Sequence, residues 1–175
     1  HVNILENEVK SAIINNIIGT YNLLSACNEN GIDKFVMIST DKAATPTTVM
    51  GKTKKFCELI VEYFNSQNKN TSFLSVRFGN VFNSSGSVIQ IFKEQIENGE
   101  ELTLTDPNVD RFFMSIDEAV KLVIKASQMG SGGEVFVLDM GTPIKIIDIA
   151  QRMIHLSGNT IKNELNPNLS LIHIW

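Results

Sequence analysis

Short apolar runs alternate along this chain with longer segments in which apolar residues recur at every third or fourth position. Runs of the first kind fit strands, and segments of the second kind fit amphipathic helices. The strand-like runs are 34–40, 73–78, 102–105 and 134–138, and the helical segments are 7–29, 48–66, 88–98, 116–128 and 146–157. This alternation predicts βαβ units. We therefore expect an α/β fold with a doubly wound parallel sheet, in which the run 35–38 is typical of a strand covered on both faces.

The composition argues against several classes of function. A hydrophobic content of 43% and a net charge of −4 over 175 residues fit a soluble globular domain. The lysines are scattered, whereas nucleic-acid binding needs a concentrated basic face, so we expect no nucleic-acid partner. Cys27 and Cys57 stand outside any Cys/His cluster, which predicts buried free thiols and no metal site. No apolar run reaches the about 18 residues that would predict a membrane-spanning helix.

Two features of the sequence limit what the sheet can contain. No G-x-G-x-x-G turn follows a strand-like run, although a dinucleotide-binding sheet normally begins with one. If the sheet is of that kind, we expect its first half to be missing from this chain. Residues 169–175 follow a polar Asn/Pro stretch and match the translation of a common sequencing adapter. We expect them to be an artefact that belongs to no element, with a short native strand as the alternative.

Hydroxyl, carboxylate and amine side chains follow one another where the first strand-like run ends. They are Ser39, Thr40, Asp41 and Lys42. Open α/β sheets bind their ligands at the carboxyl ends of parallel strands, so this is the expected position of a site. In the helix that follows, Met50 and Lys54 are four residues apart and share one face.

Five motifs, taken in order, resemble those of the extended short-chain dehydrogenase/reductases. They are Asn16-x-x-Gly19-Thr20, Phe35-Val-Met-Ile-Ser-Thr-Asp-Lys42, Met50-x-x-x-Lys54, Arg77-Phe-Gly-Asn80-Val81 and Arg111-Phe112. Within that family the chain is most similar to the CapD-like polysaccharide-biosynthesis branch, the UDP-N-acetylglucosamine 4,6-dehydratases. The resemblance implies a Rossmann-like parallel sheet without its N-terminal half in 1–78. It also implies a smaller substrate-binding lobe, interleaved with the last sheet strands, in 79–168.

The resemblance implies that NAD is the cofactor and assigns the catalytic side chains. Lys54 matches the lysine of the family's Tyr-x-x-x-Lys pair, which binds the nicotinamide ribose. Met50 stands in the place of the tyrosine, and a thioether cannot exchange a proton as a phenol can. The membrane-associated dehydratases of this branch resemble the chain in carrying methionine there. The resemblance therefore assigns the chemistry to Thr40, Asp41 and Lys42.

The implied reaction begins with oxidation of a UDP-sugar at C4. The 4-ketone acidifies the C5 proton, so a base removes it while an acid helps the C6 hydroxyl leave as water, and hydride then returns to C6. By resemblance Asp41 is the acid, Lys42 is the base and Thr40 holds the C4 oxygen. A desolvated pocket favours a protonated Asp41 and a neutral Lys42, whereas their mutual attraction favours the charged forms. The sequence leaves the balance between these two effects open.

The resemblance also implies the residues that bind the ligands. Those for the cofactor are Ser39, Lys54, Arg77, Phe78 and Gly79, and those for the nucleotide sugar are Asn80, Ser87, Val88 and Arg111. Residues 84–87 precede a helix whose free N–H groups suit a diphosphate, which Arg111 would also pair. Asn16 would brace the backbone near the active site. Taken alone, Asn80 also fits a Gly-Asn turn, Ser87 a helix N-cap and Arg111 a surface position.

The sequence therefore predicts an NAD-dependent nucleotide-sugar 4,6-dehydratase of polysaccharide synthesis, inactive as this chain alone. One alternative is a UDP-sugar 4-epimerase, which shares oxidation at C4 but usually keeps the tyrosine. Another is a non-catalytic NAD(P)-sensing module, in which a lost tyrosine would be expected. We expect a homo-oligomer formed through helices 7–29 and 48–66, although packing of helices on the sheet explains the same pattern. We expect a bacterial cytoplasmic location, with anchoring of the whole protein to the inner membrane left open.

Overall fold

A computed structural model of the chain describes residues 2–67, 70–82, 87–104, 106, 108–160 and 171–172. The chain divides into two compact units. The first unit comprises His1–Gly79 and Asp117–Asp139, and the second comprises Asn80–Ile116 and Met140–Trp175. The chain thus returns to the first unit for one further helix and strand. The assignment of a cofactor domain to 1–78 and a substrate lobe to 79–168 stays a prediction.

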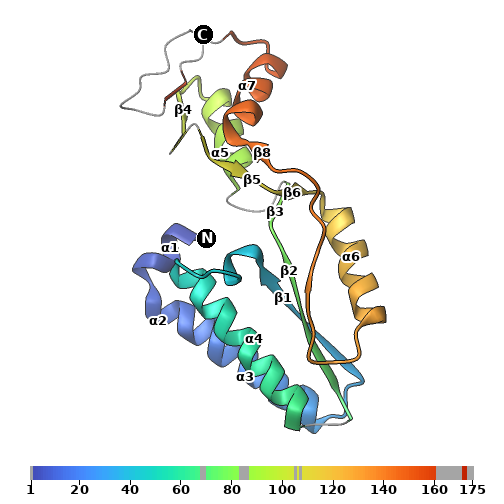
Figure 1. Cartoon of the computed structure of the whole chain (residues 1–175). Coiled ribbons are helices and arrows are strands. Elements are labelled where there is room, and N and C mark those ends of the chain that lie inside the picture. The colour runs from blue at the N-terminus through green and yellow to red at the C-terminus, as the bar shows by residue number, and fades with distance from the viewer. Residues whose placement is uncertain are drawn as a thin grey trace. The chain divides into compact units, whose positions relative to one another are not determined.

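A parallel sheet forms the centre of the first unit. Its strands are β1 (Lys34–Thr40), β2 (Ser72–Phe78) and β7 (Val135–Val137), in the order β1-β2-β7 (Figure 1). β1 and β2 pair along their whole lengths, and Ser39 and Thr40 lie opposite Arg77 and Phe78. The predicted parallel α/β arrangement is confirmed. The register brings the carboxyl ends of β1 and β2, and the polar residues that they carry, to the same edge of the sheet.

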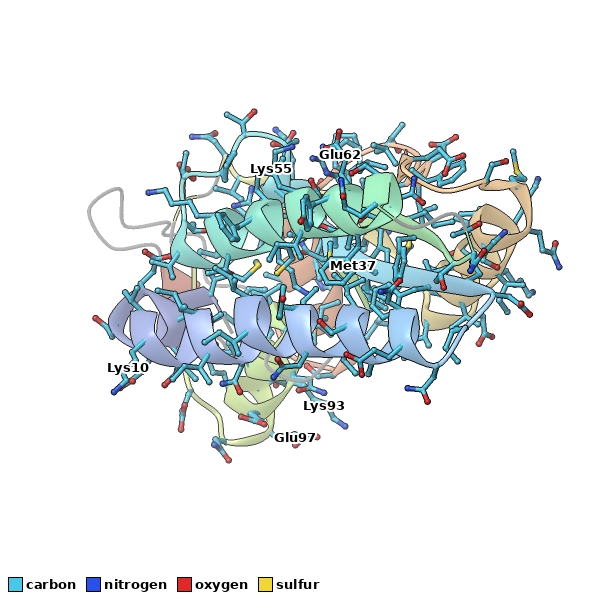
Figure 2. The ribbon with its side chains drawn as sticks, turned by 90° about the horizontal axis from the view of Figure 1, so that it is seen from below. Lys10, Met37, Lys55, Glu62, Lys93 and Glu97 are labelled. Carbon is cyan, nitrogen blue, oxygen red and sulfur yellow. The ribbon has the colours of Figure 1, made fainter. Side chains whose placement is uncertain are left out.

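Two helices, α3 (Gly19–Glu29) and α4 (Val49–Gln67), lie side by side against one face of this sheet (Figures 1 and 2). A core of buried side chains joins them to the strands, and its members are Leu24, Met37, Cys57, Val61 and Phe73. In Figure 2 Met37 lies between the two helices, while Lys55 and Glu62 lie along the outer side of α4. Helix α6 (Ile116–Met129) lies on the other side of the strands (Figure 1). Because the apolar face of α4 packs on these strands, the helix is held against the sheet.

The helix predicted over 7–29 is not a single α-helix. It consists of α1 (Val2–Asn7), α2 (Val9–Ala12), a π-helical segment (Ile13–Ile18) and α3. A π-helical turn is wider than an α-helical one, and such turns are frequent at functional sites. Here the segment contains Asn16, whose amide and carbonyl groups both bind side chains of α4. These contacts to α4 give a physical reason why the chain forms a π-helical segment here instead of a continuous α-helix. The spacing of apolar residues in 7–29 does not contain them.

The prediction that the run 35–38 is covered on both faces is wrong for part of the run. Met37 is buried, but Ile38 is 42% exposed. Side chains alternate along a strand, so Met37 faces the core formed with α3 and α4, whereas Ile38 points to the opposite face, where it stays partly exposed.

The second unit is built from helices and very short strands. The helices are α5 (Val88–Glu97) and α7 (Ile146–Leu156). The strand pairs are β3 (Asn80–Val81) with β6 (Phe113–Met114), β4 (Leu102–Thr103) with β9 (Leu171–Ile172), and β5 (Asp110–Arg111) with β8 (Ile144–Lys145). Phe92, Leu102, Ile146 and Ile154 belong to its core. Strand β9 corrects the expectation that 169–175 belongs to no element, while the origin of that segment stays a prediction.

Within the part of the chain that the structure describes, no helix is both long and apolar enough to cross a membrane.

Candidate active site

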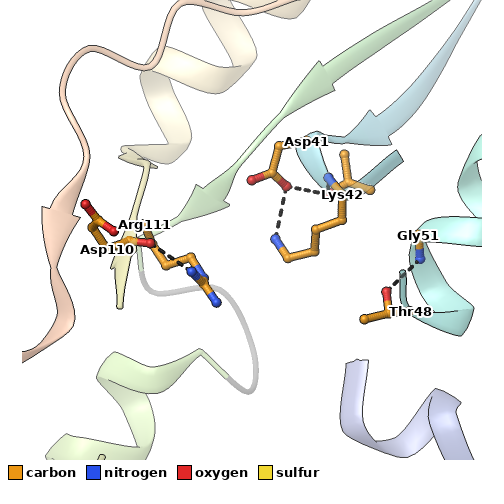
Figure 3. A network of polar contacts seen from close by, with 7 residues as sticks. Asp41, Lys42, Thr48, Gly51, Asp110 and Arg111 are labelled. Carbon is orange, nitrogen blue, oxygen red and sulfur yellow. Dashed lines mark hydrogen bonds and ion pairs between the residues drawn. The ribbon is translucent and has the colours of Figure 1, made fainter. Parts of the chain in front are cut away.

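The end of β1 carries a compact polar network (Figure 3). Thr40 is the last residue of β1, and Asp41 begins a 3-10 turn, Asp41–Ala43. The Thr40 hydroxyl donates to Asp41 Oδ1 over 2.9 Å and accepts from the Lys42 backbone N–H over 3.4 Å. Lys42 Nζ donates to the same Asp41 Oδ1 over 3.0 Å. The structure therefore brings together the three side chains to which the sequence assigned the chemistry.

The Asp41 carboxylate and the Lys42 ammonium of this network form a partly exposed ion pair. Their side chains remain 28% (Asp41) and 29% (Lys42) exposed, so both are within reach of a ligand in solution. One group that can release a proton and one that can accept it stand 3.0 Å apart on a single turn. That combination suits a reaction in which an acid and a base act on neighbouring atoms.

A glycine lets helix α4 approach this turn. A Cβ built on Gly51 would lie 2.6 Å from the backbone oxygen of Lys42, a distance that real Cβ atoms do not tolerate. The Gly51 N–H donates to Thr48 Oγ1 over 3.1 Å at the start of the helix (Figure 3). Sequence reasoning missed Gly51, although a glycine in a helical pattern is itself a sign of close packing.

Replacing Gly51 by alanine is expected to lower the free energy of unfolding by about 1–3 kcal/mol, because the new methyl group overpacks against the Lys42 carbonyl. Gly19 is the matched control, since a Cβ there meets Ile14 O at 3.7 Å, an ordinary contact. Gly19→Ala should be neutral or stabilising by up to about 1 kcal/mol. Urea unfolding of a full-length protein that contains this chain measures both changes. Equal effects of the two substitutions would contradict the close approach described here.

Helix α4 presents Met50 and Lys54 beside the strand end. Lys54 Nζ donates to the backbone oxygen of Ile38 over 3.0 Å. The Met50 carbonyl accepts from the Thr53 hydroxyl over 2.9 Å, and that hydroxyl in turn accepts from Asn16 Nδ2 over 2.9 Å. The start of α4 is thus tied both to β1 and to the π-helical segment.

Cys57 completes the tie between α4 and the π-helical segment. Its thiol donates to the backbone oxygen of Asn16 over 3.1 Å. Burial raises the pKa of the Cys57 thiol, which keeps it protonated and able to donate. Asn16 is thus bound to two α4 residues, Thr53, which sequence reasoning did not single out, and Cys57, which it named only as a free thiol. The role of Asn16 in bracing the backbone near the active site stays a prediction.

Two predicted cofactor-binding residues, Ser39 and Arg77, are bound to a glutamate that sequence reasoning missed. Ser39 Oγ donates to Glu58 Oε1 over 2.6 Å. Arg77 donates through Nε to Oε1 over 2.7 Å and through Nη2 to Oε2 over 2.5 Å. Glu58 is 2% exposed, and Lys55 Nζ lies 3.5 Å from its Oε2. A signal existed in the sequence, since a carboxylate on the apolar face of a helix needs a buried partner.

The charge of Glu58 is stabilised where it lies. Burial alone would raise its pKa, but the hydrogen bonds from Arg77 and Ser39 outweigh burial and hold the pKa of Glu58 below its usual value. The hydrogen bond to Glu58 raises the pKa of Arg77. The pair is therefore ionised across the neutral range. Of the other predicted cofactor-binding residues, Phe78 ends β2 opposite Thr40, and Gly79 follows it.

The predicted sugar-nucleotide residues lie in the second unit. Asn80 is in β3 and pairs with Phe113, and its backbone N–H donates to Phe112 O over 3.1 Å. Arg111 is in β5 and is exposed, with Nη1 donating to Asp110 O over 2.8 Å (Figure 3). The pairing of β3 with β6 therefore brings the backbones of the Asn80 and Arg111 motifs together.

The remaining two predicted substrate residues stand where α5 begins. Ser87 is the N-cap residue, and its Oγ is buried without a hydrogen-bond partner in the part of the chain that the structure describes. Val88 is partly buried, with its side chain packed against the core of the second unit. Residues 84–86 of the predicted phosphate-binding loop lie outside the described residues.

A parallel sheet with a polar site at its strand ends is the arrangement of Rossmann-like folds. The X-ray structure of Pen from Bacillus thuringiensis superposes on this chain with a TM-score of 0.86 and 36% identity, over 90% of this chain and 49% of that one. The predicted fold class, a Rossmann-like short-chain dehydrogenase/reductase sheet, is thereby confirmed. A family model described as "Polysaccharide biosynthesis protein" matches residues 1–172, and the chain belongs to that family.

Curated relatives agree with this assignment and confirm the predicted CapD-like resemblance. The capsular polysaccharide biosynthesis protein CapD of Staphylococcus aureus is 52% identical over 90% of this chain and 26% of its own length. A UDP-N-acetylglucosamine 4,6-dehydratase (inverting) of Campylobacter jejuni is 38% identical over 87% and 46%. A UDP-glucose 4-epimerase of Rickettsia canadensis is 44% identical over 72% and 38%. The chain thus spans between about a quarter and about half of the length of these relatives.

Proposed function

We propose that the whole protein containing this chain is an NAD-dependent nucleotide-sugar 4,6-dehydratase that acts on UDP-N-acetylglucosamine in polysaccharide synthesis. The observation that carries the proposal is the Asp41–Lys42 pair beside Thr40 at the end of β1. A 4,6-dehydration needs an acid at the hydroxyl oxygen on C6 and a base at the proton on C5. C5 and C6 are adjacent carbons. Two adjacent residues of opposite function meet that demand without further groups.

The pair already contains the proton that the elimination uses. The ion pair of Lys42 and Asp41 and the neutral pair differ by the transfer of one proton between the two groups, which lie 3.0 Å apart. The form that dehydrates a sugar has that same proton on Asp41 and a neutral Lys42, so no net exchange with solvent is required. A bound sugar that covers these two partly exposed side chains would remove water from both charges. The Thr40 hydroxyl stands beside Asp41 to hold the C4 oxygen.

Met50 supports dehydration over epimerisation. A thioether neither donates nor accepts a proton at neutral pH, so α4 offers no phenol at this position. The proton transfers then fall to the Thr40–Lys42 turn (Thr40, Asp41 and Lys42). Relatives named UDP-glucose 4-epimerase keep the epimerase as the second candidate.

The residues of the first unit fit a dinucleotide in part. NAD, when bound, supplies the acceptor and donor of the hydride. Lys54 is suited to its ribose, because an ammonium has three donors and Ile38 O uses one of them. Glu58 engages the Ser39 hydroxyl and two N–H groups of Arg77, so these donors are not available to a dinucleotide. We therefore assign cofactor binding in this chain to Lys54, with the backbones of Phe78 and Gly79 as further candidates.

The second unit would bind the UDP portion. Arg111 is an exposed guanidinium, which binds phosphates through paired donors. Ser87 offers a buried hydroxyl at the start of α5, where the N–H groups of Val88 and the following turn favour an anion. Asn80 would orient the sugar. Exposed Tyr21 on α3 and exposed Phe56 and Tyr63 on α4 support a homo-oligomer formed through these helices.

The proposal is tested by following deuterium placed at C4 of UDP-N-acetylglucosamine with full-length protein. A 4,6-dehydratase should deliver this deuterium to C6 of a product that has lost water. An epimerase should return it to C4 of a product of unchanged composition. A protein that binds NAD but transfers no deuterium at all would be a sensing module, and the proposed chemistry of the Thr40–Lys42 turn would be wrong.

A further inference from the structure

Glu58 is a charged residue on the buried face of α4, and its contacts reach two strands. Ser39, on β1, and Arg77, on β2, are direct neighbours across the parallel pair. The Glu58 carboxylate lies against both, with three hydrogen bonds of 2.5 to 2.7 Å. A single helical side chain therefore fixes α4 to the carboxyl ends of two adjacent strands.

The segments that Glu58 holds together, α4 and the end of β1, both carry residues of the proposed active site. Lys54 lies one turn before Glu58 on the same helix face. Ser39 immediately precedes the Thr40–Lys42 turn. A shift or rotation of α4 on the strands would therefore move the Lys54 ammonium with respect to that turn.

Stability alone does not require an ion pair at this position. Replacing a buried ion pair by apolar residues of similar volume is often neutral or stabilising. What an apolar contact cannot supply is direction, because two N–H donors of Arg77 and one hydroxyl of Ser39 allow the carboxylate a single placement. Direction matters most where reacting groups must be held within a fraction of an ångström.

We propose that Glu58 is a positioning residue of this active site, which fixes α4 on the ends of β1 and β2 and so sets where Lys54 stands relative to the Thr40–Lys42 turn. The proposal rests on the proposed function only in taking this turn to be the catalytic one. Ser39 and Arg77 then act through Glu58.

The test uses a full-length protein in which Ser39→Ala, Glu58→Met and Arg77→Met are combined, so that no buried charge or hydroxyl is left unpaired. We expect this triple variant to melt cooperatively near the wild-type temperature. Its kcat should fall about 10- to 100-fold, because misplaced catalytic groups are costly, while KM for the sugar nucleotide changes little. Its affinity for NAD should also fall. Glu97→Gln removes an exposed pair with Lys93 on α5 (Figure 2) and is the control expected to behave as wild type.

A triple variant that keeps wild-type kcat and NAD affinity would overturn the proposal. If that variant does not fold, the Glu58→Asp variant is the test, because aspartate keeps the charge on a side chain that is shorter by one methylene. A positioning residue predicts a lower kcat at similar KM, whereas a purely structural one predicts lower stability at unchanged kcat. Turnover is counted as conversion of the sugar nucleotide to any product, so kcat can be measured whether the protein dehydrates or epimerises its substrate. If wild-type protein converts nothing, the proposed function fails and NAD affinity alone decides the role of Glu58.

Discussion

Replacing Asp41 by asparagine is expected to stop the loss of water from UDP-N-acetylglucosamine while leaving exchange of the C5 proton intact. Asparagine has the same shape as aspartate and keeps an oxygen to accept from Thr40 and Lys42, but it has no proton to give to the leaving hydroxyl. Loss of a general acid typically costs about 100- to 10,000-fold in rate. Mass spectrometry of the product measures dehydration, and deuterium uptake at C5 in heavy water measures proton removal.

Asp148→Asn is the matched control for this change. Asp148 lies in the first turn of α7 and is exposed, so its loss should leave both rates unchanged. If Asp41→Asn dehydrates the sugar at the wild-type rate, Asp41 is not the acid. If it loses both dehydration and C5 exchange, its role is to arrange the site rather than to give a proton.

Replacing Lys42 by methionine is expected to slow both C5 exchange and dehydration. Each rate should fall about 100- to 10,000-fold, the same range as for dehydration by the Asp41→Asn variant. Methionine keeps the length of the side chain but cannot accept a proton. The substitution also leaves Asp41 without its ammonium partner 3.0 Å away. The same deuterium measurement separates the two variants, because only the lysine variant should fail to exchange C5.

Lys52→Met is the control for the lysine variant. Lys52 is exposed on α4, one residue after Gly51, and has no part in the proposed chemistry. Full C5 exchange in the Lys42→Met protein would show that the base lies elsewhere.

The sequence was sufficient where local pattern decides structure. The Lys34–Thr40 strand and the α4 helix follow from apolar spacing, and their order implies a parallel sheet. Because parallel strands end at one edge, the position of Thr40, Asp41 and Lys42 followed as well.

The sequence was insufficient where a side chain is set by a partner far along the chain. Ser39 and Arg77 resemble ligand-binding residues by motif, but their side chains are engaged by Glu58, 19 residues away from each. The π-helical segment around Asn16 depends in the same way on Thr53 and Cys57. A carboxylate on the apolar face of α4 signals a buried partner, but no local spacing rule identifies Ser39 and Arg77 as the partners of Glu58.

The two-residue strands of the second unit show a related limit. β5 (Asp110–Arg111) pairs with β8 (Ile144–Lys145), more than thirty residues later in the chain. A segment of two residues carries no detectable periodicity of its own, and its pairing is set by the surrounding core. The prediction of a strand over 102–105 was confirmed for Leu102–Thr103, whereas Leu104 is not in the strand and residue 105 lies outside the described residues.

The most direct test of the proposed dehydratase is the mass of the product that full-length protein forms from UDP-N-acetylglucosamine without added cofactor. The account predicts a product lighter by one water, because the hydride taken from C4 returns to C6 and no external reductant is consumed. A product of unchanged mass with an inverted C4 would contradict the dehydratase and establish the epimerase instead.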